Sequence, residues 1–123
     1  MAVDPTGAAL AEFLAAGDGD DGPIVMLNLL RFADGGREQY QRYAREFRAT
    51  FAARYGVEVL YAGNGLPALV AEPGQQWDAV LLVRYPSRRA FSRMVADPQY
   101  QQITHLRSGA LQEAVLQPTA PWA

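Results

Sequence analysis

The sequence contains no cysteine, no lysine and a single histidine among its 123 residues. The absence of cysteine excludes disulfides, thiol nucleophiles and thiolate metal sites, and one histidine cannot form a multi-histidine metal site within a chain. No apolar run approaches the roughly 20 residues that span a bilayer. The N-terminus also lacks the basic and apolar segments of a signal peptide. We therefore expect a cytoplasmic protein without a membrane partner.

The charge balance is nearly neutral, with a formal net charge of −2, and half of the residues are hydrophobic. This composition indicates one compact domain without a strong overall field. The basic pair Arg88-Arg89 is too small for a nucleic-acid surface, and we interpret it as a solvated helix face. We expect no nucleic-acid partner.

Hydrophobic periodicity and turn residues predict the order of the elements. The N-terminal part, 1–22, is predicted to form a short capped helix after Asp4-Pro5 and an acidic loop, and 120–123 form a tail. Within the domain, 23–119, a strand is predicted over 24–32, a helix over 37–55 and a second strand over 57–62, which 66–71 are a candidate to continue. A third strand over 77–85 follows, then a helix that Ser87 caps. A helical stretch over 98–111 and a last strand over 114–117 complete the domain. This order is β-α-β-β-α-β, and it predicts an α+β fold of the ferredoxin-like class with an extra N-terminal helix.

The helix over 37–55 carries an aromatic stripe at intervals of three and four residues: Tyr40, Tyr43, Phe47, Phe51 and Tyr55. We interpret the stripe as the face that packs on the sheet, with cofactor stacking as the alternative. Gly56 stands where a left-handed residue is expected to end the helix.

Both faces of the first strand are apolar, because Ile24, Met26 and Leu30 alternate with Val25, Leu27 and Leu29. The strand over 77–85 repeats this pattern. Helices cover one face of such a sheet, so the other face needs another cover. We predict a homodimer.

Four segments, "MLNLLRF", "WDAVLLVRYPSRRAF", "ADPQYQQITHLRSGAL" and "VLQPT", resemble the domain-of-unknown-function 1330 family over about 23–119. That family belongs to the dimeric α+β barrel superfamily, so the resemblance implies this fold and a dimer. The superfamily includes antibiotic-biosynthesis monooxygenases, muconolactone-type isomerases, polyketide cyclases and haem-degrading monooxygenases. The resemblance implies an apolar cleft between sheet and helices with a few polar groups directed at the substrate. In the haem-degrading branch a histidine and an asparagine lie at places comparable to His105 and Asn28, but Met94 stands where that branch has a tryptophan.

Three polar residues interrupt apolar patterns and are the candidate catalytic residues. The Asn28 amide either bonds to a neighbouring loop or across the dimer, or donates to negative charge that develops on a carbonyl or phenolate substrate. His105 has the ordinary pKa that suits proton transfer near neutral pH, although it is equally suited to a surface or capping position. On an unbroken helix, Arg107 points inward and His105 nearly the opposite way.

A buried Arg107 needs a carboxylate, for which Glu58, Asp78 and Asp97 are candidates, or it forms an anion site. Tyr61, Trp77 and Tyr85, with Met26 and Met94, are the candidate substrate-binding residues, unless they pack in the core or an interface.

The hypothesis is a cofactor-independent isomerase or cyclase that acts by proton transfer on an apolar, aromatic or polyketide-like substrate. Asn28 would be the oxyanion donor, His105 the acid or base and Arg107 the charge stabiliser, with no metal. The alternatives are a monooxygenase, either cofactor-free or with haem, and a protein that binds a small molecule without converting it.

Overall fold

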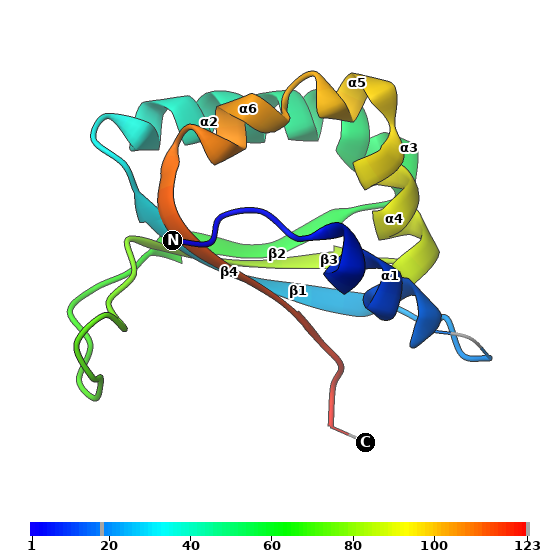
Figure 1. Cartoon of the computed structure of the whole chain (residues 1–123), viewed down its shortest axis with the longest axis horizontal. Coiled ribbons are helices and arrows are strands. Elements are labelled where there is room, and N and C mark those ends of the chain that lie inside the picture. The colour runs from blue at the N-terminus through cyan, green and yellow to red at the C-terminus, as the bar shows by residue number, and fades with distance from the viewer. Residues whose placement is uncertain (18, 123) are drawn as a thin grey trace.

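The architecture is a four-stranded antiparallel sheet with helices packed on one face (Figure 1). A computed structural model describes residues 1–17 and 19–122. The strands are β1 (Ile24–Phe32), β2 (Glu58–Asn64), β3 (Ala79–Tyr85) and β4 (Leu111–Thr119), and their order in the sheet is β2-β3-β1-β4. This is the ferredoxin-like α+β arrangement that the sequence predicts.

The helices are α1 (Gly7–Ala15), α2 (Gly36–Glu46), a π-helical turn η1 (Phe47–Phe51), α3 (Ala52–Tyr55), α4 (Arg88–Ala96), α5 (Pro98–Gln101) and α6 (Thr104–Ser108). In Figure 1, α2, α5 and α6 lie above the sheet, and α1 lies beside α4. The predicted N-terminal helix is present, but its cap is Thr6, whose Oγ1 accepts a hydrogen bond from Ala9 N at 3.0 Å. Gly56 ends α3 with a left-handed φ of 67°, as the sequence predicts.

Three predicted segments differ in the structure. The helix over 37–55 contains the π-helical turn, and the helical stretch over 98–111 divides into α5 and α6. Helix α6 ends before Leu111, because Leu111 is the first residue of β4 and pairs with Phe32 of β1. Residues 66–71 form no strand. Leu66, Leu69 and Val70 are exposed in a long loop, which closes where Gly65 N donates to Asp78 O at 2.9 Å.

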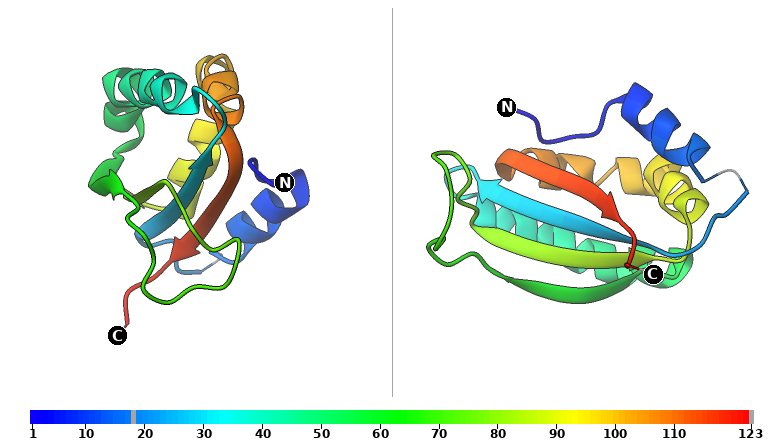
Figure 2. Two further views of the ribbon diagram at one scale, coloured as in Figure 1. Left: turned by 90° about the vertical axis from the view of Figure 1, so that its left-hand side faces the viewer. Right: turned by 90° about the horizontal axis from the view of Figure 1, so that it is seen from below.

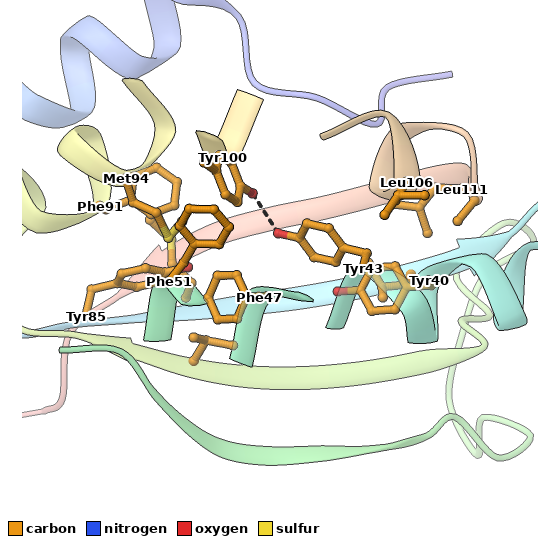
Figure 3. Close-up of a cluster of buried hydrophobic side chains, with 14 of the residues drawn as sticks. Tyr40, Tyr43, Phe47, Phe51, Tyr85, Phe91, Met94, Tyr100, Leu106 and Leu111 are labelled. Carbon is orange, nitrogen blue, oxygen red and sulfur yellow. Dashed lines mark hydrogen bonds between the residues drawn. The ribbon is translucent and has the colours of Figure 1, made fainter. Parts of the chain in front are cut away.

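The core lies between the inner face of the sheet and the helices. Met26 and Leu30 of β1 are almost fully buried there, at 2% and 0% exposure. The aromatic stripe of α2 and η1 packs above them, which confirms the interpretation of the stripe as the face that packs on the sheet. Edge-to-face contacts tie the helices together, such as Phe51 against Tyr100 with ring centroids 5.4 Å apart (Figure 3).

The outer face of the sheet carries no helix (Figure 2, right). The half-buried side chains Val25, Leu27 and Leu29 of β1 lie opposite Arg84, Leu82 and Val80 of β3. Across 1–17 and 19–122, none of the helices combines the length and the apolar character that crossing a membrane requires.

Leu30 offers a test of the core, because its side chain has no exposed surface. We predict that Leu30→Ala lowers the free energy of unfolding by about 2–5 kcal/mol through lost apolar burial and the cavity left behind. Leu66→Ala, in the exposed loop, is the matched control and should change it by less than about 0.5 kcal/mol. Urea denaturation measures both. Equal effects of the two substitutions would contradict this description of the core.

Candidate functional site

A small cavity of about 50 Å³ lies between the inner face of the sheet and the helix layer. Its walls come from both layers of the fold. The lining residues are Asn28, Tyr40, Tyr43, Ala44, Phe47, Arg48, Val59, Leu81, Val83, Tyr85 and Arg107. Apolar and aromatic groups therefore surround a few polar ones, as is usual for small-molecule sites.

Asn28 contributes its amide from the centre of β1, where the side chain faces inward and the residue is 8% exposed. Its Nδ2 donates to the Met26 carbonyl oxygen of the same strand at 3.3 Å, which is long for such a bond. An amide carries two N–H donors and one carbonyl acceptor, so this bond uses little of its capacity. Asn28 is thus a polar group of the cavity wall, on the face of β1 that it shares with Met26 and Leu30.

Arg107 reaches the same cavity from α6 and is 8% exposed. Its Nη1 donates to the Val3 carbonyl oxygen at 2.6 Å and to Asp4 Oδ1 at 3.2 Å. Its Nη2 is buried and has no hydrogen-bond partner among the described residues. The guanidinium is therefore anchored on one side and unsatisfied on the other.

The partner of Arg107 differs from all three carboxylates that the sequence suggested. Asp97 accepts hydrogen bonds from Tyr55 and Arg54, Asp78 accepts one from the Phe32 backbone, and Glu58 is exposed on β2. Asp4 takes the role because the N-terminal segment runs beside β4, where Ala114 N donates to Ala2 O at 2.9 Å. Ser108 Oγ also donates to Asp4, at 2.8 Å, which fixes the carboxylate against α6.

Four buried tyrosines lie in this part of the core, and three of them, Tyr40, Tyr43 and Tyr85, line the cavity. Tyr43 and Tyr100 share a hydrogen bond of 2.6 Å between their hydroxyl oxygens (Figure 3). Burial raises the pKa of Tyr40 to about 12 despite the opposing positive charge of Arg107. Burial likewise raises the pKa of Tyr43, Tyr85 and Tyr100. All four phenols are therefore neutral near pH 7, and they can donate hydrogen bonds but cannot serve as bases.

His105 does not join this group. It is exposed on α6 and does not line the cavity, whereas Arg107, two residues later, faces inward. His105 and Arg107 point in opposite directions, as two residues that are two positions apart on a helix do, even though α6 is shorter than the predicted helix. The structure thus brings Asn28 and Arg107 together and leaves His105 outside.

Of the predicted substrate-binding residues, Tyr85 lines the cavity. Met26 and Met94 are core residues, at 2% and 1% exposure, and do not line it. Tyr61 is 54% exposed and pairs with Leu82, on the outer face of the sheet. Trp77 lies at the end of the long loop, where the Arg31 guanidinium stacks 4.5 Å from its ring centre. Tyr61 is remote from the helix-covered face because side chains alternate along a strand, and Trp77 is not on that face because it precedes β3 and packs against Arg31.

Sequence reasoning missed the contribution of the helix over 36–55 to the cavity. Tyr40 and Tyr43 of its aromatic stripe line the cavity, and so do Phe47 and Arg48 of the π-helical turn. Turns of this kind often occur at functional sites, because they redirect side chains within a helix. The tyrosine hydroxyls of the stripe could have indicated this contribution, because a buried hydroxyl needs a polar partner.

Comparisons with known proteins place this geometry in a family context. The family described as Domain of unknown function (DUF1330) matches residues 30–117. A protein of unknown function from Rhodopseudomonas palustris is similar at 31% identity, with a TM-score of 0.85 over 98% of this chain and 97% of that one. No curated protein matches the chain.

More distant solved structures share the fold. One, from Bacteroides thetaiotaomicron, is provisionally named an antibiotic biosynthesis monooxygenase; it is 22% identical, with a TM-score of 0.60 over 83% of this chain and 91% of that one. Another is a dimeric ferredoxin-like protein of unknown function from Jannaschia, which is 10% identical, with a TM-score of 0.62 over 81% of this chain and all of that one. At these identities the similarity extends to the fold alone.

The raised pKa of Tyr40 predicts how stability changes in alkali. The unfolded phenol ionises near pH 10.0 and the folded one near 12, so its contribution is complete below pH 10 and is lost as the pH rises from about 10 through 12. The two-unit difference corresponds to about 2–3 kcal/mol. Urea denaturation between pH 9 and 12 should therefore show a shallower loss of stability for Tyr40→Phe than for the wild type. Identical alkaline slopes would contradict the assigned environment of Tyr40.

Proposed function

Because this chain belongs to the DUF1330 family, a domain of unknown function, we propose its activity from the cavity itself. The protein binds a small, mainly apolar molecule by one negatively charged oxygen group. It acts on that molecule as a cofactor-independent isomerase or cyclase, in which the bound oxygen carries the charge of an enolate or phenolate. Arg107 and Asn28 hold this oxygen.

The observation that carries the proposal is the unpartnered Nη2 of Arg107. Leaving a buried donor unsatisfied costs about 1–3 kcal/mol, and more for a charged group. An anionic oxygen at this position removes that cost and forms a charge-assisted hydrogen bond, which is about twice as strong as a neutral one. The Asn28 amide, in the same cavity wall, supplies a second donor.

The donors also define the chemistry. A positive charge and hydrogen-bond donors near an enol or phenol favour its ionised form and lower its pKa. The neutral tyrosines reinforce this effect, because a phenol hydroxyl can donate a hydrogen bond to the charged oxygen and does not remove a proton from the substrate. The substrate loses a proton to a water molecule, and the resulting enolate takes up a proton from water at a different atom, which completes the isomerisation. Water takes the role of proton acceptor because His105 lies outside the cavity.

Haem does not fit these residues. The single histidine of the chain is exposed on α6, and the cavity of about 50 Å³ is lined by one buried guanidinium, that of Arg107, and by three tyrosines. That space suits an oxygen group and a few attached atoms. The proposed chemistry therefore uses only the side chains of this protein.

We also propose that two copies of the chain associate through the outer face of the sheet. The centre of this face carries Leu27, Leu29, Val80 and Leu82, no helix covers it (Figure 2), and the similar Jannaschia protein is dimeric. Burying Leu27, Leu29 and Leu82 against the same residues of a second copy would remove this apolar surface from water.

The dimer proposal predicts that Leu29→Glu yields monomers, because a buried unpaired carboxylate is costly. Ala53→Glu, at an exposed position of α3, adds the same charge elsewhere and should leave the dimer intact. Sedimentation velocity measures both, with circular dichroism as the check of folding. A wild-type monomer at micromolar concentration would refute the proposal.

The function proposal predicts a clear order of binding defects. For the model acid 3-phenylpropionate, Arg107→Gln should weaken binding by about 10- to 100-fold, the effect of losing a charge-assisted hydrogen bond. Asn28→Ala should weaken it by about fivefold. His105→Ala is the control, because that side chain lies outside the cavity, and its affinity should equal that of the wild type. Isothermal titration calorimetry provides the measurement, and equal affinities for wild type and Arg107→Gln would rule the site out.

A further inference from the structure

An open groove of about 410 Å³ adjoins the cavity between the α2–η1 helix and strands β2 and β3. Four residues line both spaces, namely Tyr40, Ala44, Arg48 and Leu81. The other groove residues are Phe32, Arg37, Gln41, Arg45, Ala62, Gly63, Asn64 and Ala79. A ligand whose oxygen group lies in the cavity can therefore extend its remaining atoms into this groove.

The groove is positively charged. Arg37, Arg45 and Arg48 line it, and no aspartate or glutamate is among its lining residues. Arg37 is held in place, because its Nη1 donates to Asn64 Oδ1 at 2.7 Å and its guanidinium stacks 4.8 Å from the Phe32 ring centre. Arg45 and Arg48 are exposed and form no ion pair with the described residues. Two guanidinium groups are thus available to a ligand.

We infer that the ligand is a dicarboxylic acid with an apolar body, an inference that rests on the proposed function. One carboxylate, or the enolate derived from that end, occupies the cavity at Arg107. The second carboxylate lies in the groove against Arg45 and Arg48. The apolar body crosses the junction between Tyr40 and Leu81.

The two charged ends of the ligand contact arginines that differ in burial, so each end contributes differently to the binding affinity. Arg107 is buried, so its interaction with a ligand is little screened by salt. Arg45 and Arg48 are exposed, so their contribution is smaller and depends on ionic strength. The two ends of the ligand should therefore differ in their response to salt.

The test compares two acids that differ by one carboxylate, 3-phenylpropionate and 3-(4-carboxyphenyl)propionate. Calorimetry measures the affinity of each for the wild type, for Arg45→Gln/Arg48→Gln and for the control Arg42→Gln/Arg93→Gln. The control removes two exposed arginines that line neither the groove nor the cavity. Arg107→Gln is measured with both acids, and circular dichroism checks the fold of every variant.

We expect the diacid to bind the wild type at least about fivefold more tightly than the monoacid in 20 mM salt, from two exposed ion pairs. This ratio should fall close to one in Arg45→Gln/Arg48→Gln, persist in the control, and shrink for the wild type in 300 mM salt. A ratio near one in the wild type, or an equal ratio in Arg45→Gln/Arg48→Gln, overturns the inference and leaves the proposed function intact. Absence of binding by both acids, or binding that Arg107→Gln does not weaken, overturns the proposed function and the inference with it.

Discussion

The burial of Arg107 is the constraint on which the rest of the site depends. A guanidinium withdrawn from water needs hydrogen bonds and a counter-charge. The N-terminal segment supplies both to Nη1, through Val3 and Asp4, and nothing in the described chain supplies them to Nη2. The same contacts hold the N-terminal segment between α6 and β4. One side chain therefore joins the start of the chain to the interior and leaves a charged donor beside the cavity.

The aromatic layer determines what that donor can do. Burial raises the pKa of Tyr40, Tyr43 and Tyr85, so the cavity offers neutral hydroxyl donors and a positive charge but no side chain that accepts a proton near pH 7. Such a set stabilises negative charge on an oxygen. The exposed position of His105 fits this arrangement, because an imidazole in the cavity would compete for the same donors. The π-helical turn adds Phe47 and Arg48 to the lining of the cavity.

Local pattern predicted much of the fold and part of the site. Strand alternation grouped Asn28 with Met26 and Leu30 on one face, helical spacing separated Arg107 from His105, and Gly56 marked the end of the helix. The partner of Arg107 could not be predicted, because Asp4 is 103 residues away and reaches it only through the tertiary fold. The π-helical turn has no distinct sequence signature, since aromatic spacing of three and four residues suits an ordinary α-helix equally well. Tyr61 and Trp77 were assigned to the cavity from their aromatic character, although alternation and loop position put them elsewhere.

A crystal structure of the protein grown with 3-phenylpropionate would test the central claim most directly. The account predicts a carboxylate oxygen within hydrogen-bond distance of Arg107 Nη2, with the Asn28 amide as its second donor. Clear density for the acid at another site, or a protein oxygen already bonded to Nη2, would contradict it.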